Sequence, residues 1–289
     1  MGRRVSRRFV AGMTVEEAVA VAEQLNREGI DVTLDSLGES VTEMSQAEVS
    51  AGVYTQLLNE IEARRLRANV SLKLTQMGMD IGGHGAEAAG PGLAENIVAR
   101  LVEHAARIGS FVRIDMEGSE YTEATIAMTE RLYHRWPGAV GTVLQAYMFR
   151  TADDVERLLA QGIRMRLCKG AYKEPASIAF PSKADVDANY VKLAKRLMAS
   201  QVFCGIATHD ETIVDELKRF VAAHAVEKNA FEFQMLYGIR RDLQRKLVDA
   251  GFGVRVYVPF GREWYPYFMR RLAERPANVL FLAKNFFKS

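Results

Sequence analysis

The feature that most constrains how this chain can fold is a repeated alternation between short apolar segments and longer amphipathic segments. The short segments have the length and residue types of strands, whereas the longer ones carry apolar residues at the three- and four-residue spacing of helices. From residue 31 onward, eight strand-like segments occur, and each is followed by a helical one. This alternation indicates βαβ units and a parallel sheet, and eight units are what a (β/α)8 barrel requires.

The expected boundaries come from apolar runs and from the turn residues between them. Thr14 and Glu17 form a capping box that begins a helix ending at Gly29, and a glycine-rich loop is expected at residues 77–91. The expected strands cover residues 31–39, 69–75, 111–118, 142–149, 164–172, 202–210, 231–238 and 254–258. The expected helices cover residues 14–29, 45–66, 93–108, 121–136, 153–161, 187–200, 211–225 and 241–250.

We therefore expect one α/β domain, a (β/α)8 TIM barrel that covers residues 1–289. A doubly wound sheet is the alternative, because it also alternates strands and helices. That fold more often has a glycine-rich phosphate loop after its first strand. Neither GxGxxG nor GxxxxGK[ST] occurs in this sequence, so the barrel is favoured.

Polar residues stand at the carboxyl ends of strands that are otherwise apolar. In a (β/α)8 barrel these ends meet at one mouth, where active sites lie. A single charged residue at a strand end is usually an ion pair or a loop cap, but a ring of polar residues is not explained in that way. The strand-end residues are Lys73, Asp115, Gln145, Arg166, Lys169, Gly170, Thr208, His209, Gln234, Leu236 and Tyr257.

Residues 255–276 carry a basic fork after the last strand. Tyr267, Arg270, Arg271 and Glu274 share one face of the predicted helix, because they are three or four residues apart. Paired guanidiniums bind a carboxylate or phosphate, and Glu274 can fix their rotamers. The alternative is a solvent-facing row of salt bridges.

Composition argues against several classes of function. A net charge of +2 without a basic stripe does not suit nucleic acid binding, and no apolar run approaches the ~20 residues that span a bilayer. Cys168 and Cys204 lie in apolar runs, which predicts buried free thiols in a reducing cytoplasm. No Cys/His spacing is typical of zinc, so we expect no metal site. No GxSxG elbow occurs either, which argues against a nucleophilic serine of that type.

Two chemistries suit the polar ring, and a third reading makes it a binding module only. Lys73 or Lys169 can form a Schiff base, as in barrel aldolases. Alternatively, Gln145, Arg166, Lys169 and the turn at residues 208–209 hold a cofactor, with the substrate under the arginine fork. The ring alone does not decide between these readings.

Motifs along the chain resemble proline dehydrogenases, in particular the short monofunctional bacterial form. They are KLT with Lys73, RIDME with Asp115, LQAY with Gln145, RLCKGAY at residues 166–172, ATHD with Thr208 and His209, FEFQMLYG with Leu236, and FGREWYPYFMRRLAE following Tyr257. The resemblance covers nearly the whole chain, and YxxRRxxE after KGAY, ATH and EFQ makes it specific. It departs at the start, where such family members often carry extra helices before the barrel.

This resemblance implies a flavoenzyme that oxidises L-proline to 1-pyrroline-5-carboxylate, the first step of proline catabolism to glutamate. FAD would be the cofactor, with hydride passing from C5 of proline to N5 of the flavin, and electrons would leave to a membrane quinone. The implied barrel is distorted, with its last helix across the C-terminal mouth. No nicotinamide is implied.

The resemblance also assigns residues. Arg270 and Arg271 match the pair that binds the proline carboxylate, with Lys73 beside it. The positions that line the substrate pocket match Asp115, Ala171, Leu236, Tyr257 and Tyr267. The FAD contacts match the backbone at Ile114 and residues Gln145, Arg166, Lys169, Gly170, Ala171, Thr208 and His209, to which we add Gln234.

The chemistry of these residues agrees with such roles, and Asp115 and Arg166 are the expected catalytic residues. Cationic and amide donors suit a flavin that gains negative charge, and Arg166 is the candidate near N5. Asp115, a carboxylate in a cationic mouth, is expected to orient Lys73 or the substrate amine, and to act as a base only secondarily.

Three further expectations concern the periphery. The apolar tail with Lys284 and Lys288 is expected to pack on the barrel. The alternative is a peripheral contact with the inner face of the cytoplasmic membrane, as delivery of electrons to a quinone would require. Glu39 resembles a Gly-Glu turn of the family without an assigned role, and a homo-oligomer is left open.

Overall fold

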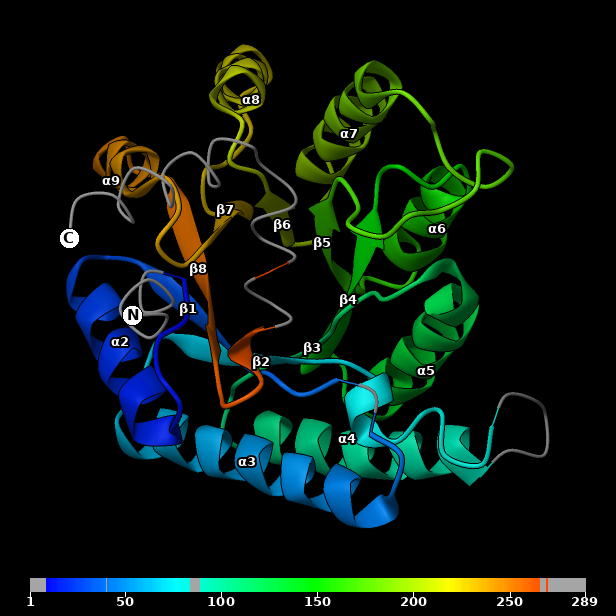
Figure 1. The fold of residues 1–289 in the computed structure, drawn as a ribbon. Helices are drawn as coiled ribbons and strands as arrows, with labels where there is room; N and C mark the ends of the chain where they lie inside the picture. Colours follow the sequence, from blue (N-terminus) through cyan, green and yellow to red (C-terminus); the bar gives the residue numbers. More distant parts are fainter. Residues whose placement is uncertain (1–8, 40, 84–88, 266–268, 270–289) are drawn as a thin grey trace, which may run out of the picture.

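In a computed structural model that describes residues 9–39, 41–83, 89–265 and 269, eight parallel strands close into one barrel (Figure 1). Each strand pairs with its neighbour in chain order, and β8 pairs with β1. The predicted (β/α)8 fold is confirmed, and the doubly wound alternative is wrong. The strands are β1 (Asp31–Ser36), β2 (Ala68–Leu72), β3 (Val112–Ile114), β4 (Val140–Gln145), β5 (Arg164–Cys168), β6 (Cys204–Ala207), β7 (Phe231–Leu236) and β8 (Gly253–Phe260).

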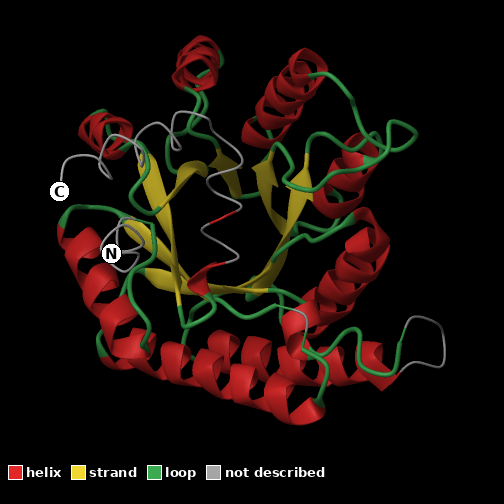
Figure 2. Cartoon of the chain, viewed as in Figure 1, coloured by secondary structure: helices red, strands yellow, loops and turns green. Residues whose placement is uncertain are grey.

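Helices form a ring outside the barrel (Figure 2). Each of β1 to β7 is followed by a helix of this ring, whereas α2 precedes β1 and packs against β1, β8 and α3. Among the described residues, no helix is both long and apolar enough to cross a membrane. The helices are α2 (Val15–Arg27), α3 (Met44–Ala63), α4 (Ala89–Arg107), α5 (Thr122–Arg135), α6 (Thr151–Leu159), α7 (Lys183–Met198), α8 (Glu211–Ala223) and α9 (Arg241–Asp249), with short 3-10 turns η1 (Thr75–Met77) and η2 (Ser119–Tyr121).

Most of the strands have one apolar face and one polar face. Val32 and Leu34 of β1 are fully buried in the core shared with the helices, whereas Thr33 and Asp35 between them are buried and polar. Because side chains alternate along a strand, the polar set points toward the barrel axis. Interiors of such barrels are usually filled by Val, Ile and Leu, so a polar interior marks this barrel as unusual.

Two glycines stand where neighbouring strands of the barrel approach each other closely. A Cβ atom on Gly141 of β4 would lie 2.2 Å from the backbone oxygen of Arg164. On Gly205 of β6 it would lie 2.4 Å from Nε2 of Gln234. Both glycines are therefore required by close packing between strands and not by backbone conformation.

Most boundaries differ from those expected by a few residues, and two of the differences have a physical reason. The helix α4 begins at Ala89, inside the expected loop, because Pro91 in its first turn needs no backbone N–H. The strand β8 runs to Phe260, past residue 258, so Tyr257 lies inside the strand and not at its end. Pro259 is tolerated because β7 ends in register with Tyr257, which leaves Pro259 with a strand neighbour on one side only.

The glycine at position 141 predicts a stability effect. Gly141→Ala should lower the free energy of unfolding by about 1–3 kcal/mol, because its methyl group overlaps backbone that cannot move freely. Gly52→Ala is the matched control, since Gly52 lies in α3 and a Cβ there meets nothing within 4 Å. The control should be neutral or more stable by about 0.5–1 kcal/mol. Urea titrations of both variants measure the difference, and equal effects would contradict the packing argument.

Candidate active site

The predicted polar ring gathers at the C-terminal end of the barrel. Its rim and its deeper layer differ in position along the strands. At the rim, side chains stand at or directly after strand ends, namely Lys73, Asp115, Gln145, Lys169, Thr208, His209 and Leu236. Below the rim, Arg166, Gln234 and Tyr257 lie inside β5, β7 and β8.

Asp115 is the centre of the hydrogen bonds in this mouth. Its Oδ1 atom accepts from the Ser71 hydroxyl at 2.5 Å and from NH2 of Arg166 at 2.9 Å. Its Oδ2 atom accepts from the Tyr257 hydroxyl at 2.8 Å. The guanidinium of Arg166 also lies 5.1 Å from the centroid of the Tyr257 ring. Since β5 and β8 are not neighbours of β3, these contacts pass through the interior of the barrel.

The surroundings of Asp115 keep it ionised. Burial acts to raise the pKa of Asp115, but Arg166, Lys73 and the donated hydrogen bonds outweigh burial and hold the pKa below its ordinary value. Burial, reinforced by the Asp115 charge, raises the pKa of Tyr257 well above its ordinary value, so the phenol stays a donor. A carboxylate with a low pKa and three fixed donors suits orientation better than proton abstraction.

Lys73, which follows the neighbouring strand β2, is held by two further carboxylates. Its Nζ atom lies 3.6 Å from Oδ2 of Asp35 and 3.4 Å from Oε1 of Glu39. Asp35 is fully buried and also accepts a hydrogen bond from the Tyr54 hydroxyl at 3.2 Å. Neither Asp35 nor Tyr54 was predicted from the sequence, and Glu39 had no expected role. The alternating pattern of DVTLDS could have revealed Asp35, because it occupies a polar position of that strand.

These carboxylates decide the protonation state of Lys73. Burial alone would lower the pKa of Lys73, but Asp35, Asp115 and Glu39 together raise it above its ordinary value. A lysine that forms a Schiff base must lose its proton, which this environment opposes. Lys169 also pairs with carboxylates, at 2.5 Å from Asp187 and 3.4 Å from Asp210.

A second group of polar side chains lies on β4, β5 and β6, which are neighbours in the barrel. Nε2 of Gln145 donates to the backbone oxygen of Glu117 at 2.9 Å. The Thr208 hydroxyl accepts from the backbone N–H of Asp210 at 3.1 Å, and Asp210 caps α8. These bonds fix the side chains on one side of the mouth, beside Lys169.

Two backbone groups of the predicted site are also defined. Nε2 of His209 accepts from the backbone N–H of Leu236 at 2.9 Å, which places the ring proton on Nδ1. The backbone oxygen of Ile114 accepts from the Thr142 hydroxyl at 3.0 Å. The hydrogen bond between His209 and Leu236 ties the turn after β6 to the end of β7.

Three other predicted residues have surroundings that the sequence did not indicate. Gly170 has φ +123°, and a Cβ atom there would lie 2.4 Å from the Tyr147 ring. Tyr147 therefore requires glycine at this position independently of any cofactor. Ala171 is exposed on the loop that follows. Nε2 of Gln234 points down the barrel and donates to Oε1 of Glu232 at 2.7 Å.

Several predicted features lie outside the described residues, namely the last helix across the mouth with Tyr267, Arg270, Arg271 and Glu274, and the tail at residues 278–289. In the part of the chain that the structure describes, no group of three or more His, Cys, Asp or Glu side chains could hold a metal ion. Cys204 is a buried free thiol, as the sequence predicted, whereas Cys168 is only half-buried, so the prediction was wrong for Cys168.

Comparison with known proteins points to one family. A family model described as proline dehydrogenase matches residues 18–284. The chain is 40% identical over 285 residues to the proline dehydrogenase of Deinococcus radiodurans. This alignment covers 98% of this chain and 90% of that protein. It is 38% identical over 283 residues to proline dehydrogenase 1 of Bacillus subtilis, in an alignment that covers 98% of this chain and 91% of that protein.

A solved structure has the same barrel. Proline utilization A (PutA) from Bdellovibrio bacteriovorus, inactivated by N-propargylglycine, superposes with a TM-score of 0.84 at 23% identity. The match covers 93% of this chain and 32% of that longer chain. At this identity the likeness supports the fold alone.

The contacts of Asp115 predict how stability depends on pH. Asp115→Asn should lower the free energy of unfolding by about 3–5 kcal/mol near neutral pH, because it leaves buried cations without their carboxylate. The folded-state pKa of Asp115 is depressed, so its contribution is complete above the ordinary value of 3.8 and is lost as pH falls through the folded-state pKa.

The difference between wild type and Asp115→Asn should thus stay constant from about pH 8 to 5 and shrink in more acid solution. Denaturant titrations at several pH values test this. Asp249→Asn, at the exposed end of α9, serves as the control and should change little at any pH. A difference that does not shrink in acid would mean that the charge of Asp115 is not what stabilises the fold.

Proposed function

The chain belongs to the proline dehydrogenase family, and we propose that it oxidises L-proline to 1-pyrroline-5-carboxylate with FAD and delivers the electrons to a membrane quinone. The observation that carries this proposal is the buried, ionised Asp115, held by Ser71, Arg166 and Tyr257 at the C-terminal mouth. A carboxylate that three donors hold in one orientation is suited to orienting a small charged substrate.

The residues at the mouth fit FAD by the chemistry of their donors. Gln145, Arg166, Lys169 and Thr208 stand on three neighbouring strands, and they offer amide, guanidinium, ammonium and hydroxyl groups. These residues, with His209 and the backbone at Ile114, would hold the cofactor; Gly170, Ala171 and Gln234 complete the set. When bound, FAD supplies a two-electron acceptor that takes hydride at N5.

The substrate would lie between this donor group and Lys73. Its carboxylate would bind to Arg270 and Arg271, with the Lys73 ammonium beside it. Oxidation removes a hydride from C5 and a proton from the amine nitrogen, which leaves a C=N bond. We propose that Asp115 orients the amine and that proton removal by Asp115 is secondary, because its pKa is low.

Arg166 and Tyr257 would limit the space above the substrate ring. The Tyr257 hydroxyl is committed to Asp115, so its ring is held in one orientation against the Arg166 guanidinium. With Leu236, and with Tyr267 from the following segment, this ring would form apolar walls that suit an unsubstituted pyrrolidine. Arg166 would also stand nearest to the position that accepts hydride.

The alternatives are less well supported. A lysine aldolase needs a lysine that is readily deprotonated, whereas three carboxylates stabilise the ammonium form of Lys73. A silent binding module would not need a fixed, ionised carboxylate at the C-terminal mouth. A peripheral membrane contact and a homo-oligomer are also proposed, but neither depends on the residues of this mouth.

The first test is a visible spectrum of the purified protein with FAD added. We expect a yellow protein that binds FAD noncovalently and is bleached by L-proline under anaerobic conditions. An aldolase would be colourless and would be trapped by borohydride with a carbonyl substrate. A module that only binds would show flavin absorbance without bleaching. A colourless protein that takes up no FAD would refute the proposed function.

The second test concerns the arginine fork. Arg270→Met or Arg271→Met should raise the KM for proline by roughly 10- to 100-fold, because a charge-assisted contact to a carboxylate is lost. Flavin content should hardly change. Arg245→Met is the matched control, since Arg245 is an exposed residue of α9 that pairs with Glu28. If KM stays within about twofold of wild type, the fork is only a solvent-facing row of salt bridges.

A further inference from the structure

A cavity of about 530 Å³ opens at the N-terminal end of the barrel, opposite to the proposed active site. The first residues of several strands line it, among them Asp31 of β1, Asn69 of β2 and Arg164 of β5. Its volume is typical of sites for small molecules. The proposed oxidation of proline uses none of these residues.

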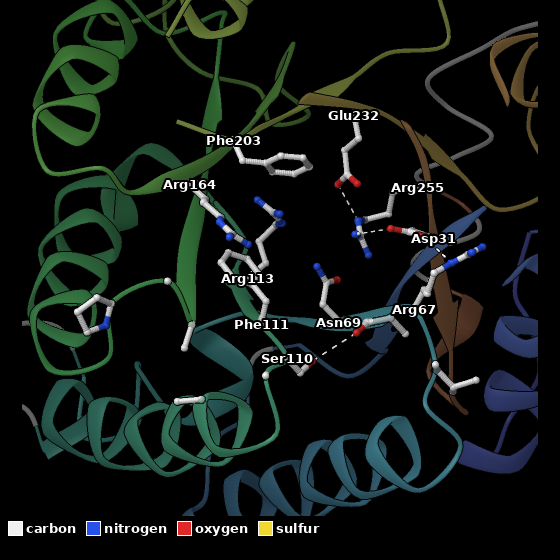
Figure 3. Close-up of a pocket in the computed structure, with 17 residues that line it drawn as sticks. Asp31, Arg67, Asn69, Ser110, Phe111, Arg113, Arg164, Phe203, Glu232 and Arg255 are labelled. Carbon is white, nitrogen blue, oxygen red and sulfur yellow. Dashed lines mark hydrogen bonds and ion pairs between the residues drawn. The ribbon is translucent and has the colours of Figure 1, made fainter. Parts of the chain in front are cut away.

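The charges around this cavity do not balance. Its lining includes four guanidinium groups and only two carboxylates, from Arg67, Arg113, Arg164, Arg255, Asp31 and Glu232 (Figure 3). Asp31 already pairs with Arg67 at 3.0 Å and with Arg255 at 3.2 Å, and Glu232 pairs with Arg255 at 2.6 Å. Among the described residues, no carboxylate comes within ion-pair distance of Arg113 or Arg164. Two positive charges are therefore left without a partner of opposite sign.

Arg113 is the more unusual of the two, because it is buried. Only 3% of its surface is exposed, and its Nε atom has no hydrogen-bond partner among the residues that the structure describes. Its one recorded hydrogen bond is a long one, from NH1 to the backbone oxygen of Thr142 at 3.5 Å. Burial, together with repulsion from Arg166, lowers the pKa of Arg113 to about 9, so the group remains charged at neutral pH.

Arg164 lies at the opening of the same cavity and is exposed. Its guanidinium stands 5.6 Å from the ring centroids of both Phe111 and Phe203, and the guanidinium of Arg113 stands 5.1 Å from the Phe111 ring. Figure 3 shows Arg113, Arg164 and Phe203 converging on the cavity from different strands and turns. One buried and one exposed guanidinium thus approach the same space over a shared aromatic ring.

We propose that this cavity binds a phosphate group between Arg113 and Arg164. A dianion would neutralise both unmatched charges, and the flat guanidinium suits the oxygens of a phosphate. The ligand would enter past the exposed Arg164 and reach Arg113 beneath it. Phe111 and Phe203 offer an apolar surface to the rest of a phosphorylated molecule, while Asn69 and Ser110 add polar groups to the wall.

A purely structural role would account for these arginines less well. The N-terminal end of a (β/α)8 barrel normally serves stability. A buried cation without a counter-charge does the opposite, because its desolvation is not compensated. Arg67 and Arg255 do fit a structural role, since each bonds to a carboxylate and to a backbone oxygen.

The test measures binding of inorganic phosphate and of phenyl phosphate to the purified full-length protein. Calorimetric titrations are run at constant ionic strength, with sodium chloride as the reference anion. The variants are Arg113→Met and Arg164→Met. Arg135→Met is the matched control, because Arg135 is an exposed arginine against Trp136 that does not line the cavity.

We expect saturable binding of phosphate to the wild type and to Arg135→Met. Affinity should fall at least tenfold in Arg113→Met and in Arg164→Met. Without phosphate, Arg113→Met should also melt at the wild-type temperature or higher, since it removes an unpaired buried charge. Tighter binding of phenyl phosphate would indicate a phosphorylated molecule, and equal binding would indicate free phosphate.

Two results would overturn the proposal. One is the absence of saturable binding of either probe above the chloride reference. The other is binding to Arg164→Met that equals binding to the wild type. If Arg113→Met does not fold, Arg164→Met decides alone, because its exposed side chain can be removed without opening the core. All readouts are independent of flavin and proline, so failure here leaves the proposed oxidation untouched.

Discussion

The balance of charge inside the barrel is the constraint on which the rest of this structure depends. Arg113 is buried, and the side chains of Arg166, Arg255 and Lys73 are only 12–13% exposed. A charge with so little access to bulk water is costly unless it is paired. Asp115 forms an ion pair with Arg166, and Asp35 forms one with Lys73. Arg255 forms an ion pair with Glu232. The positions of these carboxylates decide where the barrel can bind charged molecules. A cation that has no carboxylate partner within the protein is left to bind an anionic ligand.

The two ends of the barrel differ in whether their buried cations have carboxylate partners. At the C-terminal mouth, each buried cation has a carboxylate, and the pKa shifts of Asp115 and Lys73 both favour the charged forms. A zwitterion such as proline enters such a site without disturbing its net charge. At the N-terminal end, Arg113 stays unmatched, and burial lowers its pKa instead. A neutral or zwitterionic ligand would not correct that excess, whereas an anion would.

The sequence predicted the barrel and most residues of the mouth, including Arg166 and Tyr257 below the rim, but not the contacts that fix them. Periodicity identifies strands and helices locally, and Lys73, Asp115 and Gln145 stand at positions where strands end. The partners that fix Asp115 are far away along the chain, 44 residues for Ser71, 51 for Arg166 and 142 for Tyr257. No local pattern encodes such pairs. The alternating polar positions inside the strands were visible, yet parallel strands in such barrels are usually apolar on both faces, so their meaning required the closed sheet.

The same alternation explains how a barrel with so polar an interior can be stable. The outward set, for example Val32, Leu34, Val70 and Leu72, is fully buried against the helices, and this interface supplies the apolar contacts that hold the fold. A slip of one residue in any strand would exchange the two faces, placing charges against the helices and apolar groups in the mouth. The cost of that exchange is large on both sides of the sheet. The register is therefore specified twice, once by the helices outside and once by the ion pairs inside, and the positions of the site follow from both.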